Sequence, residues 1–213
     1  MLLFSNYHFV SLYVTRLVPC CYSSPAEMSF LLMSFLAGAM KIRQKSRKWR
    51  QQYGILLNLE KYADAKQVAE DLFNVLNEEN FVGHEAESAA DFYRNKSQYF
   101  DAILLYHVAF KLYELQNKQR KVLDGVKECA WGTELVVYDM KVKKQPGHRS
   151  VVTHYVLPLM SEMKQSMKLA NVEDPDHKAS QIASCKHYIE VVKTLQSKQK
   201  RNRPHLHKGC QLM

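Results

Sequence analysis

The last four residues of the chain have the types and the order of a lipid-attachment signal. The ending CQLM places Cys210 fourth from the end, in the C-a-a-X form whose cysteine sulfur receives a farnesyl group when methionine is last. Gln211 is not aliphatic, but the first a position is the tolerant one. The ending therefore predicts farnesylation of Cys210, with an unmodified tail as the alternative.

The stretch that precedes this cysteine is rich in basic residues. Residues 193–208 carry six basic residues and no acid. One lipid chain alone holds a protein only marginally on a membrane, whereas a lipid chain beside a polybasic patch holds it stably. We therefore expect association with the cytosolic face of a membrane, with an electrostatic contribution from Lys198, Lys200, Arg201, Arg203 and Lys208.

The rest of the sequence contains no pattern that predicts catalysis. It has no Gly-rich phosphate loop, no GxSxG, no HExxH and no paired-cysteine metal spacing. His205, His207 and Cys210 are metal-ligating types, but ligands on a flexible tail lack the preorganisation that tight binding needs. We expect no enzyme activity, no cofactor and no bound metal. The odd number of cysteines, five, indicates a reduced, intracellular protein.

Composition predicts an all-α protein with its charge concentrated in two tracts. The 213 residues are 46% hydrophobic and include only seven Gly and six Pro, too few for the many tight turns of an all-β chain. Residues 41–50 carry six basic residues and no acid, and the tract before Cys210 carries another six. Because the net charge of the whole chain is +9, the residues outside these two tracts carry a net charge of −3. Such tracts attract anionic lipid or nucleic acid, and a solvated surface is the alternative for each.

The first 44 residues form an apolar segment that we set apart from the rest. Its longest apolar run, residues 28–40, is shorter than the roughly 20 residues of a membrane-spanning helix. We favour a core or interfacial helix over a signal peptide, because no basic region opens the chain. Translation from Met28 or Met40 is a further alternative.

Two stretches in the middle of the chain resemble each other. Residues 49–73 and 86–110 each contain a helix-length segment, a short polar break, then Tyr-x-x-Ala and a second helix-length segment, with Tyr62 and Tyr99 at a 37-residue interval. Small residues three or four apart share one helix face and let a partner helix approach closely. The predicted packing residues are Trp49, Tyr62, Ala65, Ala69, Tyr93, Tyr99, Ala102, Tyr106 and Ala109.

These packing positions resemble those of the tetratricopeptide repeat family. The interval differs from that family's period of about 34 residues, the helix-ending proline is absent, and Tyr53 stands where a small residue is usual. The resemblance implies stacked antiparallel helical hairpins in this part of the chain, and with the helical patterns that follow we predict such a stack over residues 45–199 and a flexible basic tail over residues 200–213. Residues 85–142 are also similar to the microtubule-interacting-and-trafficking domain, a three-helix module that binds peptide helices in membrane-remodelling pathways. The sequence is compatible with both resemblances.

The C-terminal half predicts three more helices. Residues 119–142 have a helical apolar stripe that Gly125 and Gly132 weaken, and residues 143–150 form a loop. Residues 151–170 carry a methionine stripe, with Pro158 either in the first turn or at a kink. Asp174, as an N-cap before Pro175, starts the last helix.

The sequence as a whole predicts a non-enzymatic scaffold or adaptor tethered to a membrane. Its helical-repeat surface would bind a peptide or helix segment of a partner protein, and we note Lys61, Lys66 and Arg94 as exposed cations that could meet an acidic peptide. The alternatives are a peptide-binding module of the microtubule-interacting-and-trafficking type and a basic helical protein that binds nucleic acid. Neither basic tract contains interleaved aromatics apart from Trp49, which disfavours the last.

Overall fold

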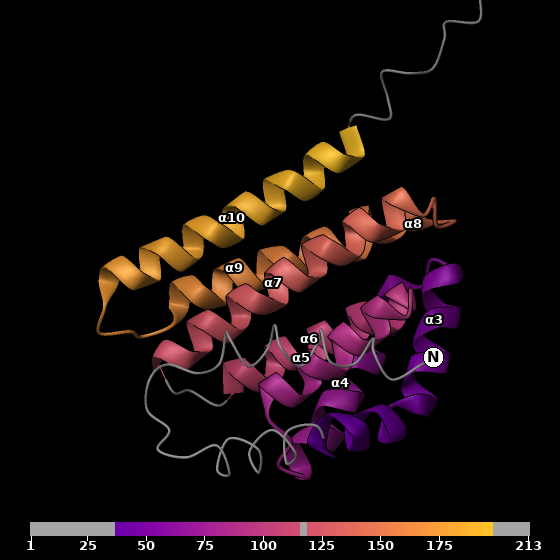
Figure 1. Ribbon diagram of the computed structural model, residues 1–213, viewed down its shortest axis with the longest axis horizontal. Helices are drawn as coiled ribbons and strands as arrows, with labels where there is room; N and C mark the ends of the chain where they lie inside the picture. Colours follow the sequence, from indigo (N-terminus) through magenta and orange to yellow (C-terminus); the bar gives the residue numbers. More distant parts are fainter. Residues whose placement is uncertain (1–36, 116–118, 198–213) are drawn as a thin grey trace, which may run out of the picture. The chain divides into compact units, whose positions relative to one another are not determined.

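Figure 1 shows the computed structural model of the chain, which describes residues 37–115 and 119–197. Every regular element in these ranges is a helix, which confirms the predicted all-α class. The chain divides into two compact units, residues 1–38 and 39–213, and the labelled helices belong to the second. They are α3 (Arg47–Asn58), α4 (Tyr62–Glu78), α5 (Gly83–Asn95), α6 (Tyr99–Leu115), α7 (Gln119–Val142), α8 (His148–Val151), the π-helical η1 (Val152–Val156), α9 (Leu157–Leu169) and α10 (Pro175–Ser197).

Several predictions concern residues outside the described ranges. They include the lipid site Cys210, the tail histidines and most of the apolar run at residues 28–40. They also include the five cations Lys198, Lys200, Arg201, Arg203 and Lys208. Of the apolar N-terminal segment, residues 37–44 are described and are helical, in a helix that continues to residue 45.

Helix α6 is the centre of the second unit. It packs against α3, α4, α5, α7 and α9. Residues 102–110 of this helix are buried without interruption. A helix that is apolar on all sides must be enclosed by other elements, and α6 meets that condition.

The two similar stretches fold as two helical hairpins. Tyr62 is the first residue of α4 and Tyr99 is the first residue of α6. α3 packs against α4, α5 against α6, and α4 against α6, so the two tyrosine-led helices are neighbours. The small residues that permit this approach are all buried, namely Ala65, Ala69, Ala102 and Ala109.

Four helices end in the same hydrogen-bonded turn. At the end of α3, the Lys61 N–H donates to the Leu56 carbonyl at 2.9 Å and the Glu60 N–H donates to the Leu57 carbonyl at 3.1 Å. This is the Schellman motif, and the same pair of bonds ends α4, α5 and α7. The motif requires a left-handed backbone at one residue, and non-glycine residues occupy that place: Glu60, Asn80, Ser97 and Lys144.

The glycines of α7 contribute close packing between helices. A Cβ at Gly132 would overlap the Tyr106 ring, and a Cβ at Gly125 would overlap the Tyr113 ring. Tyr113 also covers Gly83 of α5. The absence of these side chains therefore allows α6 to lie against α7 with a tyrosine ring at each contact.

Pro158 lies inside a continuous helical stretch rather than at its start. α8, η1 and α9 follow one another without a break over residues 148–169, and Pro158 is the second residue of α9. A proline lacks the N–H of the regular ladder, and the preceding π-turn accommodates that loss. Beyond it, Met160, Met163 and Met167 are completely buried, so the methionine stripe belongs to the core.

The last helix begins where the sequence predicts it to begin. Asp174 Oδ1 accepts a hydrogen bond from the His177 N–H at 2.9 Å, and α10 starts at Pro175. One face of this helix includes Cys185, Ile189 and Val192, all buried. α10 packs with this face against α7 and α9.

Candidate functional site

A cleft opens between α4 and α9, with α6 at its base. Its volume is about 190 Å³. Its walls are Tyr62, Ala63, His154, Pro158 and Leu159, its floor is His107 and Tyr155, and its rim is Lys66 and Glu162. We call this feature the α4–α9 cleft. The π-turn that contributes His154 and Tyr155 is a type of irregularity found frequently at functional sites.

One wall of the α4–α9 cleft is a stacked pair of rings. Tyr62 and His154 lie with ring centroids 5.5 Å apart and planes inclined by 24°. The Tyr62 hydroxyl donates a hydrogen bond to Ser150 Oγ at 2.7 Å. Tyr62, predicted as a repeat-packing residue, thereby connects α4 to the helical stretch that begins at His148 and forms a wall of the cleft.

The rim is a single ion pair between the two sides of the cleft. Lys66 Nζ of α4 lies 2.5 Å from Glu162 Oε1 of α9. Both side chains are well exposed, so the pair contributes little to stability. It does place one positive and one negative charge at the entrance, which leaves the entrance electrically balanced.

The floor contains a buried histidine bonded to a buried tyrosine. His107 Nδ1 lies 2.7 Å from the Tyr155 hydroxyl, and the Tyr155 ring meets Tyr53 edge-on with centroids 5.5 Å apart. Burial raises the pKa of both tyrosines, which keeps their phenols protonated. Burial, assisted by Lys111 and Lys66, lowers the pKa of His107 to about 3, so the ring is neutral at neutral pH.

The second ring nitrogen of His107 has no hydrogen-bond partner within the protein. Nε2 is buried, and Glu70 Oε1 lies 3.9 Å away, beyond hydrogen-bonding distance. Buried polar atoms are nearly always hydrogen-bonded, so this nitrogen is an exception, and it is enclosed too closely for a water or ligand atom to reach it in this conformation.

This arrangement suits binding better than proton transfer. A general base works best with a pKa near the operating pH, and a histidine with a pKa of about 3 is far below that. In the described part of the chain, no group of three or more His, Cys, Asp or Glu side chains could hold a metal ion. Burial also raises the pKa of the thiols of Cys129 and Cys185, which makes them poor nucleophiles.

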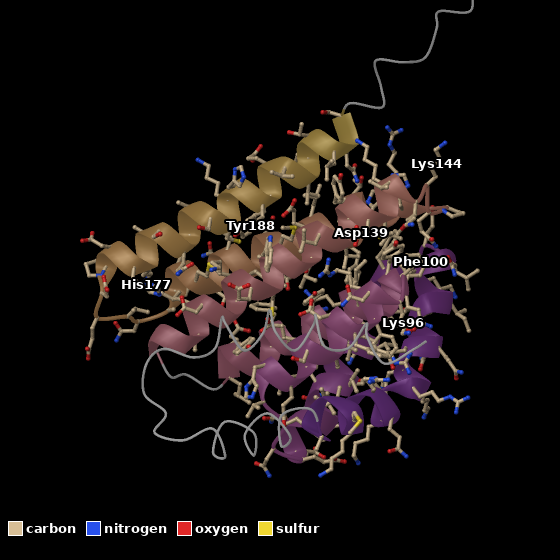
Figure 2. The ribbon with its side chains drawn as sticks, in the orientation of Figure 1. Lys96, Phe100, Asp139, Lys144, His177 and Tyr188 are labelled. Carbon is tan, nitrogen blue, oxygen red and sulfur yellow. The ribbon has the colours of Figure 1, made fainter. Side chains whose placement is uncertain are left out.

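The cations suggested for an acidic peptide do not form one surface. Lys61 is exposed. Lys66 is paired at the rim of the cleft. Arg94 is half-buried rather than exposed, because it lies 3.7 Å from both Asp91 Oδ1 and Asp139 Oδ2. Asp139, labelled in Figure 2, belongs to α7, so the Arg94 contact connects α5 to α7.

Two of the six cations of the first basic tract, Arg43 and Arg50, are partly buried and pack against aromatic rings. Arg50 forms an ion pair with Asp101 at 2.7 Å, and its guanidinium carbon lies 4.2 Å from the Tyr93 ring centroid. Arg43 stacks on the Phe92 ring, and Lys45 forms an ion pair with Glu79 at 2.8 Å. Lys45 is exposed, as are the remaining three cations of the tract, namely Lys41, Arg47 and Lys48.

The predicted packing residues occupy the interior of the second unit. Trp49 and Tyr62 are partly buried against the core, and the other seven are buried, namely Ala65, Ala69, Tyr93, Tyr99, Ala102, Tyr106 and Ala109. The Tyr106 hydroxyl donates to Asp91 of α5. The floor residues His107 and Tyr155 were not singled out from the sequence, although a histidine inside the apolar run at residues 102–110 is a signal that could have identified one of them.

Comparison with protein-family models, with curated proteins and with solved structures gives no match for this chain. Among the described residues, no helix combines the length and the apolar character that a bilayer crossing requires. The structure therefore defines the class of the protein by itself, as an all-α stack of helices with a ring-lined interhelical cleft.

Proposed function

We propose that this protein is a non-enzymatic scaffold that binds a segment of a partner protein in the α4–α9 cleft. The observation that carries the proposal is the cleft itself, which has mostly apolar walls that include the stacked rings of Tyr62 and His154. A cleft of this kind buries an inserted side chain.

The resemblance to tetratricopeptide repeats supports this proposal. The α3–α4 and α5–α6 hairpins pack side by side through α4 and α6, and the packing residues shared with that family are buried or partly buried. Proteins built from stacked hairpins bind extended segments of other proteins on their surfaces. The proposed docking site lies at the edge of the first hairpin, where α4 faces α9.

A microtubule-interacting-and-trafficking type of module is the second candidate. The observation that favours it is the mutual packing of α5, α6 and α7, which is a three-helix arrangement. The opposite side of α6 is covered by α3, α4 and α9, so a ligand helix would have to bind on α5 or α7. Substitutions in the α4–α9 cleft would then leave partner binding intact, which distinguishes the two candidates.

The docking site is tested with one substitution that fills the cleft. Ala63 is exposed on the cleft wall, so Ala63→Phe blocks the entrance without altering the core. Peptides selected from a displayed random library on the full chain should lose binding to Ala63→Phe at least tenfold. They should bind Ala179→Phe unchanged, because Ala179 is exposed near the start of α10, away from the cleft. Equal binding of the peptides to both variants would show that the α4–α9 cleft is not the docking site.

We also propose that a lipid on Cys210 holds the scaffold at a membrane, on the basis of the terminal sequence and the cations before it. The test is flotation of the full chain from cells with liposomes that contain phosphatidylserine, together with intact-mass measurement. The expected result is a farnesyl mass increment and flotation that Cys210→Ser abolishes. Flotation that survives the substitution and yields to added RNA would instead support a nucleic-acid-binding protein.

A further inference from the structure

We infer that the outer side of α3, together with the end of the helix before it, binds the surface of an anionic phospholipid membrane. We call this surface the α3 outer face. Its members are the unpaired exposed cations and the large exposed apolar side chains of residues 40–59, namely Met40, Lys41, Arg47, Lys48, Ile55 and Leu59. The inference extends the proposed membrane attachment to a second surface, and it does not require a lipid on Cys210.

The charges of the α3 outer face are all positive. Residues 41–59 contain no aspartate and no glutamate. Lys41, Arg47 and Lys48 are exposed, and within residues 37–115 and 119–197 none of them forms an ion pair. Because these three charges are not balanced by the protein itself, the face attracts a negatively charged partner.

Acidic side chains from neighbouring helices do not neutralise this face. Lys45 Nζ lies 2.8 Å from Glu79 Oε1, and Arg50 Nη1 lies 2.7 Å from Asp101 Oδ2. Each of these carboxylates is therefore paired with a cation that is not a member of the α3 outer face. Glu60, the first acid in the sequence after this stretch, lies next to its apolar end.

Helical hydrogen bonds connect α3 to the helix that precedes it. The Ser46 N–H donates to the Ile42 carbonyl at 2.8 Å, and the Arg50 N–H donates to the Ser46 carbonyl at 2.9 Å. These bonds join residues four apart, as in a regular α-helix, so the helical spacing of side chains continues through the junction.

This spacing places the cations and the apolar side chains on one side. Lys41, Lys48 and Ile55 follow one another at intervals of seven residues, so they lie in one row along the helix. Met40 and Arg47, also seven apart, lie in the adjacent row. α3 packs against α4 and α6 with its other side, and Figure 1 shows it at the edge of the helix stack.

The exposed apolar side chains favour a membrane over other anionic partners. In the described ranges seven large hydrophobic side chains are more than half exposed, and three of them, Met40, Ile55 and Leu59, belong to this one face. A bilayer surface offers anionic headgroups to the cations and acyl-chain carbon to the apolar side chains. A nucleic acid offers phosphates to the cations, but its bases require exposed aromatic rings for stacking, and Trp49 is partly buried.

The inferred contact is weak by itself and supplements the proposed lipid. Each basic residue close to an anionic membrane strengthens binding about fivefold. A single lipid chain also binds only marginally, so the two signals together are what would hold the protein stably. We therefore expect the α3 outer face alone to bind in equilibrium measurements at low ionic strength and to release the membrane during flotation.

The test measures equilibrium partitioning of the full chain carrying Cys210→Ser onto vesicles of phosphatidylserine and phosphatidylcholine at low ionic strength. Lys41→Gln with Lys48→Gln should lower the partition coefficient about tenfold. The charge-matched control is Lys168→Gln with Lys186→Gln, on α9 and α10, where both lysines are exposed. This control should lower the coefficient less than about threefold. Vesicles of phosphatidylcholine alone should bind none of these proteins.

A second pair of variants tests the apolar contribution. Ile55→Ser with Leu59→Ser should lower vesicle partitioning at least threefold, because each apolar side chain that leaves water strengthens binding. The control is Leu169→Ser, at the exposed end of α9, which should leave partitioning unchanged. In NMR spectra of the chain without these substitutions, a lipid with a spin-labelled headgroup should broaden the amide signals of residues 40–59 before those of α10.

Three results would overturn the inference. The first is no partitioning of the Cys210→Ser chain onto phosphatidylserine vesicles. The second is an equal loss from the two lysine pairs, which would assign the binding to net charge alone. The third is unchanged partitioning in Ile55→Ser with Leu59→Ser, and competition by single-stranded RNA would then identify the face as a nucleic-acid surface. None of these results bears on the lipid at Cys210 or on the α4–α9 cleft, because the tested chain carries no lipid and its cleft is unaltered.

Discussion

His107 is a residue at which burial has a large chemical effect. Its ring lies in the middle of α6, bonded to Tyr155 across 48 residues of sequence, with Lys66, Lys111 and Glu70 as the nearest charged groups. The neutral ring tolerates this environment because its Nδ1 is satisfied. A protonated ring would have to lose its hydration beside two lysines, which is the physical cause of the lowered pKa.

The lowered pKa predicts that stability falls in mild acid. An unfolded chain has a His107 pKa near 6.5, whereas the native value is about 3, so protons bind preferentially to the unfolded chain in between. The contribution of this residue is complete above about pH 6.5 and declines as the pH falls toward 3. Between pH 7 and pH 5 the free energy of unfolding should drop by about 2 kcal/mol through His107 alone.

Urea unfolding at the two pH values measures this effect. The control is His107→Phe, in which this part of the pH dependence should be absent while the contribution of all other groups remains. An identical drop in both proteins would mean that His107 titrates in the native state as it does in the unfolded chain.

At the scale of the helices, tyrosine-on-glycine contacts set how closely α6 and α7 approach. The Tyr106 ring occupies the space that a side chain at Gly132 would need. By contrast, no atom lies within 4 Å of the place where a Cβ at Gly54 of α3 would be. The two glycines therefore have opposite roles, although both lie in helix interiors.

This contrast predicts opposite effects of the same substitution. Gly132→Ala should lower the free energy of unfolding by about 1–3 kcal/mol, because the helices must separate or Tyr106 must move. Gly54→Ala should raise it by about 0.5–1 kcal/mol, through better helix propensity in an open position. Thermal or urea unfolding of the two variants gives the measurement. If Gly132→Ala instead raised the free energy of unfolding, the contact between α6 and α7 would have room for a methyl group.

The four Schellman turns give a second prediction for the helices. Glu60, Ser97 and Lys144 adopt left-handed backbone angles that strain an ordinary side chain. Glycine at each of these three positions should raise the free energy of unfolding by about 0.5–1 kcal/mol. Asn80→Gly serves as the internal control and should have a smaller effect, because asparagine tolerates this conformation. A gain at Asn80 equal to the other three would contradict the strain explanation.

Local signals explain which helices could be predicted. The range predicted for α7, residues 119–142, and the start of α10 at Pro175 both agree with the structure, because each depends on neighbouring residues. The breaks that separate the paired helices were also predicted, although no glycine marks the left-handed positions. The π-turn was not predicted, because only Pro158 indicates it and proline is equally compatible with a helix start.

The site could not be predicted from sequence for a different reason. Tyr62, Ala63 and Lys66 lie on α4, whereas His154, Tyr155 and Glu162 lie about ninety residues further along the chain. Their meeting depends on how α9 packs against α6 and α7, which no local pattern specifies. Hydrophobic periodicity identifies which face is buried but does not identify the partner of that face.

At the scale of the second unit, the structure is a stack arranged around one enclosed helix. α6 has neighbours on every side, whereas α10 packs only against α7 and α9 among the helix pairs in close contact. The start of α10 also contacts α7, because Asp124 of α7 lies 3.0 Å from His177 and accepts a hydrogen bond from Gln181. Opening of α10 therefore disturbs fewer contacts than exposure of α6.

This arrangement predicts a gradient of native-state hydrogen exchange. Amides of residues 102–110 should exchange only through global unfolding, with protection equal to the full free energy of unfolding. Amides in the last turns of α10 should exchange through local opening, and therefore faster and with little dependence on urea. Measurement by NMR at low urea concentrations tests this order. Slower exchange in α10 than in α6 would contradict the central role of α6.

The π-turn Val152–Val156 acts as a phase adjustment of one residue in the chain. Deleting one residue from it would restore an ordinary α-helix and leave everything beyond in the same rotational phase, because the widened turn already accommodates the extra residue. The buried methionines at positions 160, 163 and 167 would stay in the interior, and Glu162 would stay at the mouth of the cleft. Single-residue deletion here should therefore be far less harmful than a deletion early in the regular turns of α9, which would rotate the rest of that helix by about 100°.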